Sequence, residues 1–148
     1  MIKSINIYKF TNGNKFILHP LLQIKGFISI ASAPYLTEYN LSNTELLEKI
    51  LYTLEFSKEI LEKPENWKEF QKEFLKGMGV KTMKALHDGT INLGIYIKDG
   101  IITFSPSQNK GSKEGFVGFK EDLKVSLPFD SPKKELEKAL ELALSRCK

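Results

Sequence analysis

The chain has 148 residues, of which 41% are hydrophobic and 27% charged, and it carries a net charge of +4. That length and composition are typical of one globular domain and exclude a disordered chain, which lacks the apolar residues for a core. No apolar run reaches the roughly 18 residues of a membrane span, and the alternating N-terminus is unlike a signal peptide. Together with a single cysteine, Cys147, these features predict one cytoplasmic domain over residues 1–148.

Lysine supplies all but one of the 22 basic residues, the exception being Arg146. Dispersed lysine mostly confers solubility, whereas nucleic-acid binding favours arginine and clustered charge. Residues 41–76 form an acidic block with six Lys and eight Glu, a net charge of −2. This block would attract a basic partner by electrostatic steering, although its residues also fit ion pairs on a solvated helix face.

The first predicted elements are strands. Lys3–Lys9 and Lys15–Leu18 alternate apolar and polar residues on either side of Asn12-Gly13, a favoured two-residue hairpin turn. A third strand is predicted over Gly26–Ala31, ended by Pro34. The chain is therefore expected to open with a small antiparallel sheet.

Two helices are predicted next. Ser42 and Glu45 have the spacing of a capping box, and apolar residues recur at helical intervals over Leu46–Leu54. The second helix is marked by Pro64 in its first turn, by the apolar stripe Trp67, Phe70 and Phe74, and by Gly77 and Gly79 at its end.

The second half begins with a linking segment, residues 80–90, which has room for one helical turn. A second hairpin is predicted from Ile91–Lys98 and Ile101–Ser105, which flank Asp99-Gly100. Residues Pro106–Gly118 are rich in Gly, Ser and Lys and are expected to form an exposed loop.

A final strand and a final helix complete the predicted elements. The strand covers Leu123–Leu127, and the helix has Ser131 as its cap and Pro132 in its first turn. Because the order shows no regular strand–helix–strand alternation, it predicts an α+β fold. We expect a single domain, mainly an antiparallel sheet with about three helices packed on it.

Groups that could support catalysis or metal binding are few. His19 and His87 stand far apart with no metal-ligand spacing around them, and His87 precedes an Asp-Gly turn. Cys147 shares the apolar stripe of the last helix, which favours packing over nucleophilic chemistry. Gly115–Phe119 matches only the end of an RNA-recognition motif, so its aromatic residues are expected to anchor a loop in the core. The sequence thus predicts no enzyme, no metal and no cofactor.

Residues 68–148 carry a family resemblance. Its features are a lysine-rich segment over Lys81–Lys84, a strand pair ending in Ser105-Pro106, a Gly-rich loop with aromatic residues, a strand over Leu123–Pro128 and a terminal helix ending in Ala143–Cys147. In these features the chain resembles the immunity proteins of bacterial contact-dependent growth inhibition (CDI). Leu123, Val125, Leu136, Leu140 and Leu144 are expected to build the core of this half.

The resemblance implies a function and a partner. A donor cell delivers a toxic, nuclease-like domain, and the immunity protein binds its cognate toxin domain 1:1 in the cytoplasm, blocking the active site or substrate access. Such a protein needs no nucleic acid, membrane or small-molecule substrate. The residues alone leave two alternatives open, a nucleic-acid-binding module and a general protein-interaction module.

Contact residues should be exposed aromatic and charged groups, and five candidates fit this description. They are Tyr35, Tyr39, Glu55, Glu59 and Glu62. The net charge of +4 departs from expectation, because inhibitors of basic nucleases are usually acidic. Either the acidic helix pair in residues 41–76 forms the binding face, or the toxin is not a basic nuclease.

Overall fold

The computed structural model describes residues 2–148, which form four helices and nine strands. In chain order these are β1 (Lys3–Phe10), β2 (Lys15–Ile24), β3 (Ser29–Ala31), β4 (Leu36–Tyr39), α1 (Asn43–Leu54), β5 (Lys58–Ile60), α2 (Trp67–Gly77), α3 (Met83–His87), β6 (Thr90–Lys98), β7 (Ile101–Asn109), β8 (Phe116–Gly118), β9 (Val125–Pro128) and α4 (Lys133–Arg146). The predicted α+β class is confirmed, with four helices where about three were expected.

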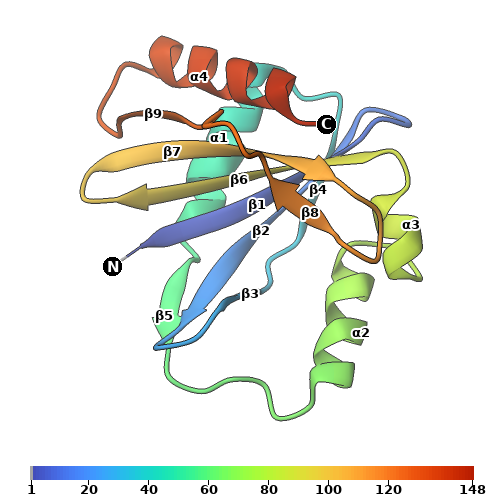
Figure 1. Cartoon of the computed structure of the whole chain (residues 1–148). Coiled ribbons are helices and arrows are strands. Elements are labelled where there is room, and N and C mark those ends of the chain that lie inside the picture. Colours follow the sequence, from blue (N-terminus) through green and yellow to red (C-terminus); the bar gives the residue numbers. More distant parts are fainter. Residues whose placement is uncertain (1) are drawn as a thin grey trace.

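The sheet is curled and almost entirely antiparallel, as predicted (Figure 1). Its path is β3-β2-β1-β6-β7-β8, while β4 and β5 pair with β2 and β9 pairs with β7. The exception to the antiparallel pattern is β5, which lies parallel to the end of β2. The long strands are therefore central, and each edge is made of strands only three or four residues long.

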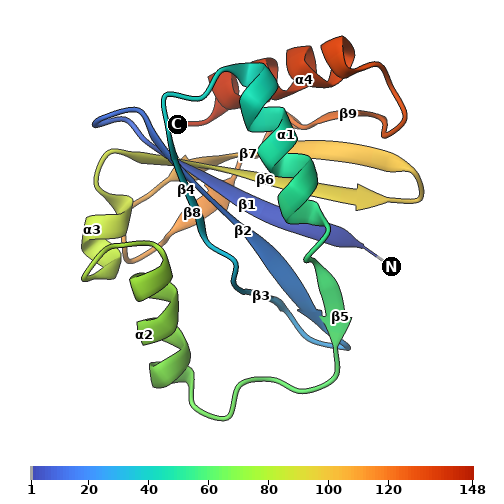
Figure 2. The ribbon, with the colours of Figure 1, turned by 180° about the vertical axis from the view of Figure 1, so that it is seen from behind.

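Strand alternation places the main core on one face of the sheet. Ile5 and Ile7 of β1 point to this face together with Leu18 of β2 and Ile95 of β6, and all are fully buried. α1 and α4 cover them, α1 crossing the back of the sheet and α4 lying along its upper side (Figures 1 and 2). Leu136 and Leu140 of α4 are buried here as predicted, while Val125 and Leu144 pack at its margin.

The opposite face carries a smaller cluster. Tyr8 and Ile17 project to it. The half-buried Phe74 of α2, Met78 just after α2 and Leu86 of α3 pack in the same cluster. α1 and α2 thus contribute to different clusters on opposite faces of the sheet. The acidic block of residues 41–76 is therefore divided between the two faces of the sheet, and α1 and α2 do not present one common surface.

The two predicted hairpin turns have different outcomes. Asp99 and Gly100 have φ values of 52° and 76° and join Lys98 directly to Ile101, so this two-residue turn is confirmed. The first turn is longer than predicted, because the pairing of β1 with β2 stops at Phe10 and Lys15. Four residues close this loop, with Gly13 and Asn14 at positive φ.

The predicted loop over Pro106–Gly118 was partly wrong, because β7 continues to Asn109 and β8 begins at Phe116. Pro106 is tolerated within β7 because the partner on its outer edge changes there. β9 pairs with Ile101–Phe104, and β8 pairs with Ser107–Asn109. Pro106 lies between these two ladders, where its missing N–H breaks no strand pairing on that side.

Helix starts also differ from the predictions in two places. Asn66 caps α2, so Pro64 precedes the helix instead of lying in its first turn. Pro132 is the N-cap of α4 and makes no side-chain cap bond, while the Ser131 hydroxyl donates to the Pro128 carbonyl at 2.6 Å. The capping box of α1 and the glycine-rich end of α2 are as predicted, and α3 is the expected helical turn.

Candidate functional site

The five predicted contact residues do not form one surface. Tyr39 in β4 pairs with Lys15 at the start of β2, whereas Glu59 in β5 pairs with Gln23 near its end. Eight positions along a strand correspond to roughly 26 Å at about 3.3 Å per residue. Tyr39 and Glu59 therefore lie at opposite ends of the sheet, and one small interface would not contain both.

Tyr35 has a structural role on the second face. Its ring centroid lies 5.3 Å from that of His19 and 6.3 Å from that of Phe74, and its ring packs against Gly77 at the end of α2. Burial raises the pKa of Tyr35 to about 12, and the nearby carboxylate of Glu73 contributes to this shift. Tyr35 thus fastens α2 to the sheet, and contact with a partner remains a prediction for it.

The three predicted glutamates lie close together along the chain. Glu55 is the C-cap of α1, Glu59 is in β5 and Glu62 is in the segment that leads to α2, and all three are exposed. β5 lies beside the end of β2, so the segment that carries Glu59 runs next to the β2–β3 turn. The backbone N–H of Lys25 in this turn donates to the Ile60 carbonyl at 3.0 Å.

Three apolar side chains at this end were not predicted as contact residues. Leu61 is 77% exposed, Ile28 57% and Phe27 55%. We define the end patch as Phe27, Ile28 and Leu61 together with the carboxylates of Glu59 and Glu62. Sequence reasoning missed its apolar part because a predicted strand over 26–31 would bury part of it. The sequence does contain a signal for a turn here, the pair Lys25-Gly26, in which a polar residue precedes a glycine.

His19 is a fully buried imidazole on the second face, stacked on Tyr8 with ring centroids 5.6 Å apart. Its Nδ1 lies 3.0 Å from the Pro20 carbonyl, which can only accept, so Nδ1 carries the proton. Nε2 has no hydrogen-bond partner among the described residues. Burial therefore lowers the pKa of His19 to about 4, and the ring is neutral at physiological pH.

The other candidate chemical groups are used in packing. His87 Nδ1 donates to the Met83 carbonyl at 2.7 Å, and the His87 ring stacks on Phe116 with ring centroids 4.5 Å apart. Phe116 also contacts Tyr8 and packs at the second cluster, as the loop-anchor prediction expected. Cys147 packs against the main core, and its thiol donates to the Asn92 carbonyl at 3.3 Å. Within residues 2–148, no three His, Cys, Asp or Glu residues gather in a metal-ligating group.

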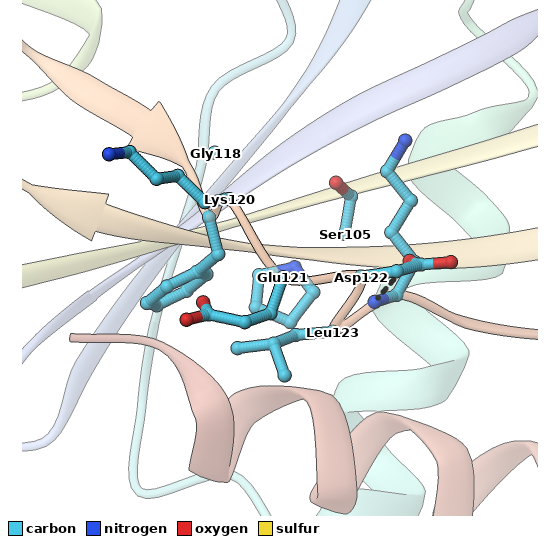
Figure 3. A pocket seen from close by; sticks show the side chains of 9 residues that line it. Ser105, Gly118, Lys120, Glu121, Asp122 and Leu123 are labelled. Carbon is cyan, nitrogen blue, oxygen red and sulfur yellow. Dashed lines mark hydrogen bonds between the residues drawn. The ribbon is translucent and has the colours of Figure 1, made fainter.

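A surface hollow of about 370 Å³ lies between β7 and the loop that joins β8 to β9 (Figure 3). Ser105 and Pro106 form one wall and residues 118–124 form the rest. Arg146 of α4 holds this loop, because its guanidinium donates to the Leu123 carbonyl at 2.9 Å. The charged residues of the loop, including Glu121 and Asp122, are exposed. They supply solvent-facing charge and no converging set of catalytic groups.

Two solved structures share this arrangement of sheet and helices over the whole chain. A protein of unknown function from Neisseria meningitidis has a TM-score of 0.77 at 20% identity, covering 100% of this chain and 96% of that one. A CdiA-CT/CdiI toxin and immunity complex from Yersinia pseudotuberculosis has a TM-score of 0.76 at 20% identity, covering 100% of this chain and 98% of that one. The protein therefore has an α+β fold that is also found in a chain of a toxin and immunity complex.

The family follows from the sequence itself. The family model for CdiI, the CDI immunity protein, matches residues 25–147. The chain therefore belongs to the CDI immunity protein family, and the resemblance over residues 68–148 is confirmed and extends further toward the N-terminus. No curated protein matches the chain. No helix in the described part is long and apolar enough to cross a membrane.

Proposed function

We propose that the protein binds the toxic domain of its cognate CDI effector in the cytoplasm, and blocks that domain's active site or its access to substrate. The observation that carries this proposal is the CdiI family match over residues 25–147. The fold shared with a chain of the Yersinia pseudotuberculosis complex is consistent with it. A binding function is consistent with the structure, because the two histidines and the cysteine are occupied in packing.

Co-expression tests the protective role. The toxin domain encoded immediately upstream should arrest growth when it is induced alone, and this protein should restore growth when it is expressed in the same cytoplasm. A non-cognate immunity protein of the same family provides the control for expression load. Growth arrest that persists despite soluble expression of this protein would contradict the proposal.

Reconstitution with purified proteins separates the two modes of inhibition. We expect a 1:1 complex by light scattering, and loss of toxin activity at equimolar protein. If the active site is blocked, the complex should also fail to bind substrate or a substrate analogue. If only access is blocked, a small analogue should still bind while the full substrate does not.

A further inference from the structure

We propose that the end patch binds a basic face of the toxin domain. This inference rests on the function proposed above. The patch combines the exposed side chains of Phe27, Ile28 and Leu61 with the carboxylates of Glu59 and Glu62. Figures 1 and 2 show β5 beside the β2–β3 turn, at the opposite end of the molecule from α4.

Apolar exposure is concentrated at this end. Phe27, Ile28 and Leu61 are three of the four most exposed large hydrophobic side chains in the described part of the chain, the fourth being Tyr39 at the other end of β2. Single exposed hydrophobic residues are ordinary, but a group rimmed by polar residues is typical of a protein-binding surface. The Lys63 ammonium lies 5.3 Å from the Phe27 ring centroid, which ties the segment after β5 to the turn.

The backbone under the patch is already ordered. The Phe27 N–H donates to the Ile24 carbonyl at 2.8 Å, and the Ile24 N–H donates to the Ile28 carbonyl at 3.2 Å. β5 adds a parallel pairing along the end of β2, reaching Ile24 and Ile60. Because the turn is fixed before binding, a partner would order little backbone, which favours affinity.

Charge identifies the kind of partner. Residues 55–65 contain four Glu and two Lys, a net charge of −2 in a chain whose net charge is +4. The ion pairs of the described residues involve Glu38, Glu69 and Glu135, so the four carboxylates of this segment are not neutralised by an ion pair. With the exposed Lys25 of the β2–β3 turn included, four Glu and three Lys leave a net charge of −1 around the apolar centre. This negative balance is complementary to a basic protein surface.

Calorimetric titration with the purified upstream toxin domain tests the apolar part of the patch. The double variant F27A/L61A should weaken the dissociation constant by about 30-fold or more, the effect expected of interface hot spots. The matched control is F129A/L142A, which truncates the same two residue types at exposed positions just after β9 and on α4, across the sheet from the patch. The control should bind within about threefold of the wild type.

A charge-reversal pair tests the electrostatic part. E59K/E62K should weaken binding by about tenfold, mainly through slower association. E121K/E141K changes the net charge by the same amount at exposed positions away from the patch and should leave the dissociation constant within about threefold. Thermal denaturation of each variant shows that the fold is retained, since all the substituted side chains are exposed.

The outcomes distinguish this proposal from the function on which it rests. Wild-type binding with patch variants that bind like their controls overturns the patch and leaves the immunity function intact. A wild-type protein that does not bind the toxin overturns the function itself. If the patch variants abolish self-association of the protein alone while toxin binding is unchanged, the patch belongs to a second copy of the chain and the proposal is wrong.

Discussion

At the scale of single residues, His19 couples protonation to stability. Burial lowers the pKa of His19 from about 6.5 to about 4, and its Nε2 has no partner in the described structure. Between these two pH values the unfolded chain binds a proton that the folded protein does not bind. The free energy of unfolding should therefore fall as the pH drops through this window, by about 3 kcal/mol in total from this residue.

The variant H19F isolates this contribution. Phenylalanine keeps an aromatic ring against Tyr8 and Tyr35, and the Pro20 carbonyl still accepts from the Ser32 N–H at 3.1 Å. Urea denaturation at several pH values between 7 and 4 should show a shallower loss of stability in H19F than in the wild type. Parallel curves for the two proteins would mean that His19 titrates normally in the folded state.

Gly77 is a residue at which alanine should be harmful despite its helical position. A Cβ at Gly77 would lie 2.6 Å from Cγ of Tyr35, a part of the ring that cannot turn away freely. Overpacking of this kind costs about 1–3 kcal/mol, which exceeds the gain of about 1 kcal/mol in helix propensity. Thermal denaturation should therefore show G77A to be destabilised.

Two comparisons make the Gly77 prediction specific. Gly118 has no atom within 4 Å of a built Cβ, so G118A should have little effect. In a Y35A background the G77A change should become neutral or stabilising, because the colliding ring is gone. A loss of stability that is equal in both backgrounds would locate the cause elsewhere than in the Tyr35 contact.

At the scale of helices and strands, the elements that neighbouring residues determine were predicted, and those that depend on pairing with another strand were not. The capping box at Ser42 and the turn at Asp99-Gly100 were predictable, because neighbouring residues determine both. The strands β4, β5 and β8 were not predicted. Each has only three or four residues and is defined by its pairing with β2 or β7 instead of by a pattern of its own.

The candidate site shows the same division between local and distant information. The charge pattern along the chain is enough to select Glu59 and Glu62 as contact candidates. Their grouping with Phe27 and Ile28 depends on the parallel pairing of β5 with β2, which no local pattern indicates. Tyr35 was chosen as an exposed aromatic residue, but the packing of α2 on the second face partly buries it.

The capping box of α1 gives a prediction at this scale. The Ser42 hydroxyl accepts from the Glu45 N–H at 3.2 Å, and the Glu45 carboxylate accepts from the Ser42 N–H at 3.0 Å. S42A should lower the free energy of unfolding by about 1 kcal/mol, as measured by urea denaturation. T44A is the control, since Thr44 is exposed in the same turn and outside the box. Equal effects of the two changes would contradict a specific capping role.

The helices should also differ in local stability. α1 has five buried residues, four of them in the main core, whereas α2 has none and packs through half-buried side chains such as Phe74. Few buried contacts allow a segment to open without global unfolding. In hydrogen–deuterium exchange, amides of residues 71–77 should exchange at least about tenfold faster than the central amides of α1. Similar protection in both helices would show that α2 unfolds only with the whole domain.

For the molecule as a whole, the distribution of charge matters more than its sum. The acidic segment 55–65 lies at the end opposite α4, so a net charge of +4 does not describe what a partner meets there (Figure 1). Salt screens both the overall repulsion between two basic proteins and the local attraction at the end patch. These two effects have opposite signs, and the salt dependence of association therefore tells them apart.

Stopped-flow measurement of complex formation with the toxin domain shows whether salt slows or speeds association. If the end patch makes the contact with a basic face, the association rate constant should fall several-fold as NaCl rises from about 50 to about 500 mM. The E59K/E62K variant should lose this dependence or reverse it, because it removes the local attraction and adds repulsion. A wild-type rate that rises with salt would mean that the net charge of +4 governs the encounter, and that the toxin meets a basic part of the surface instead.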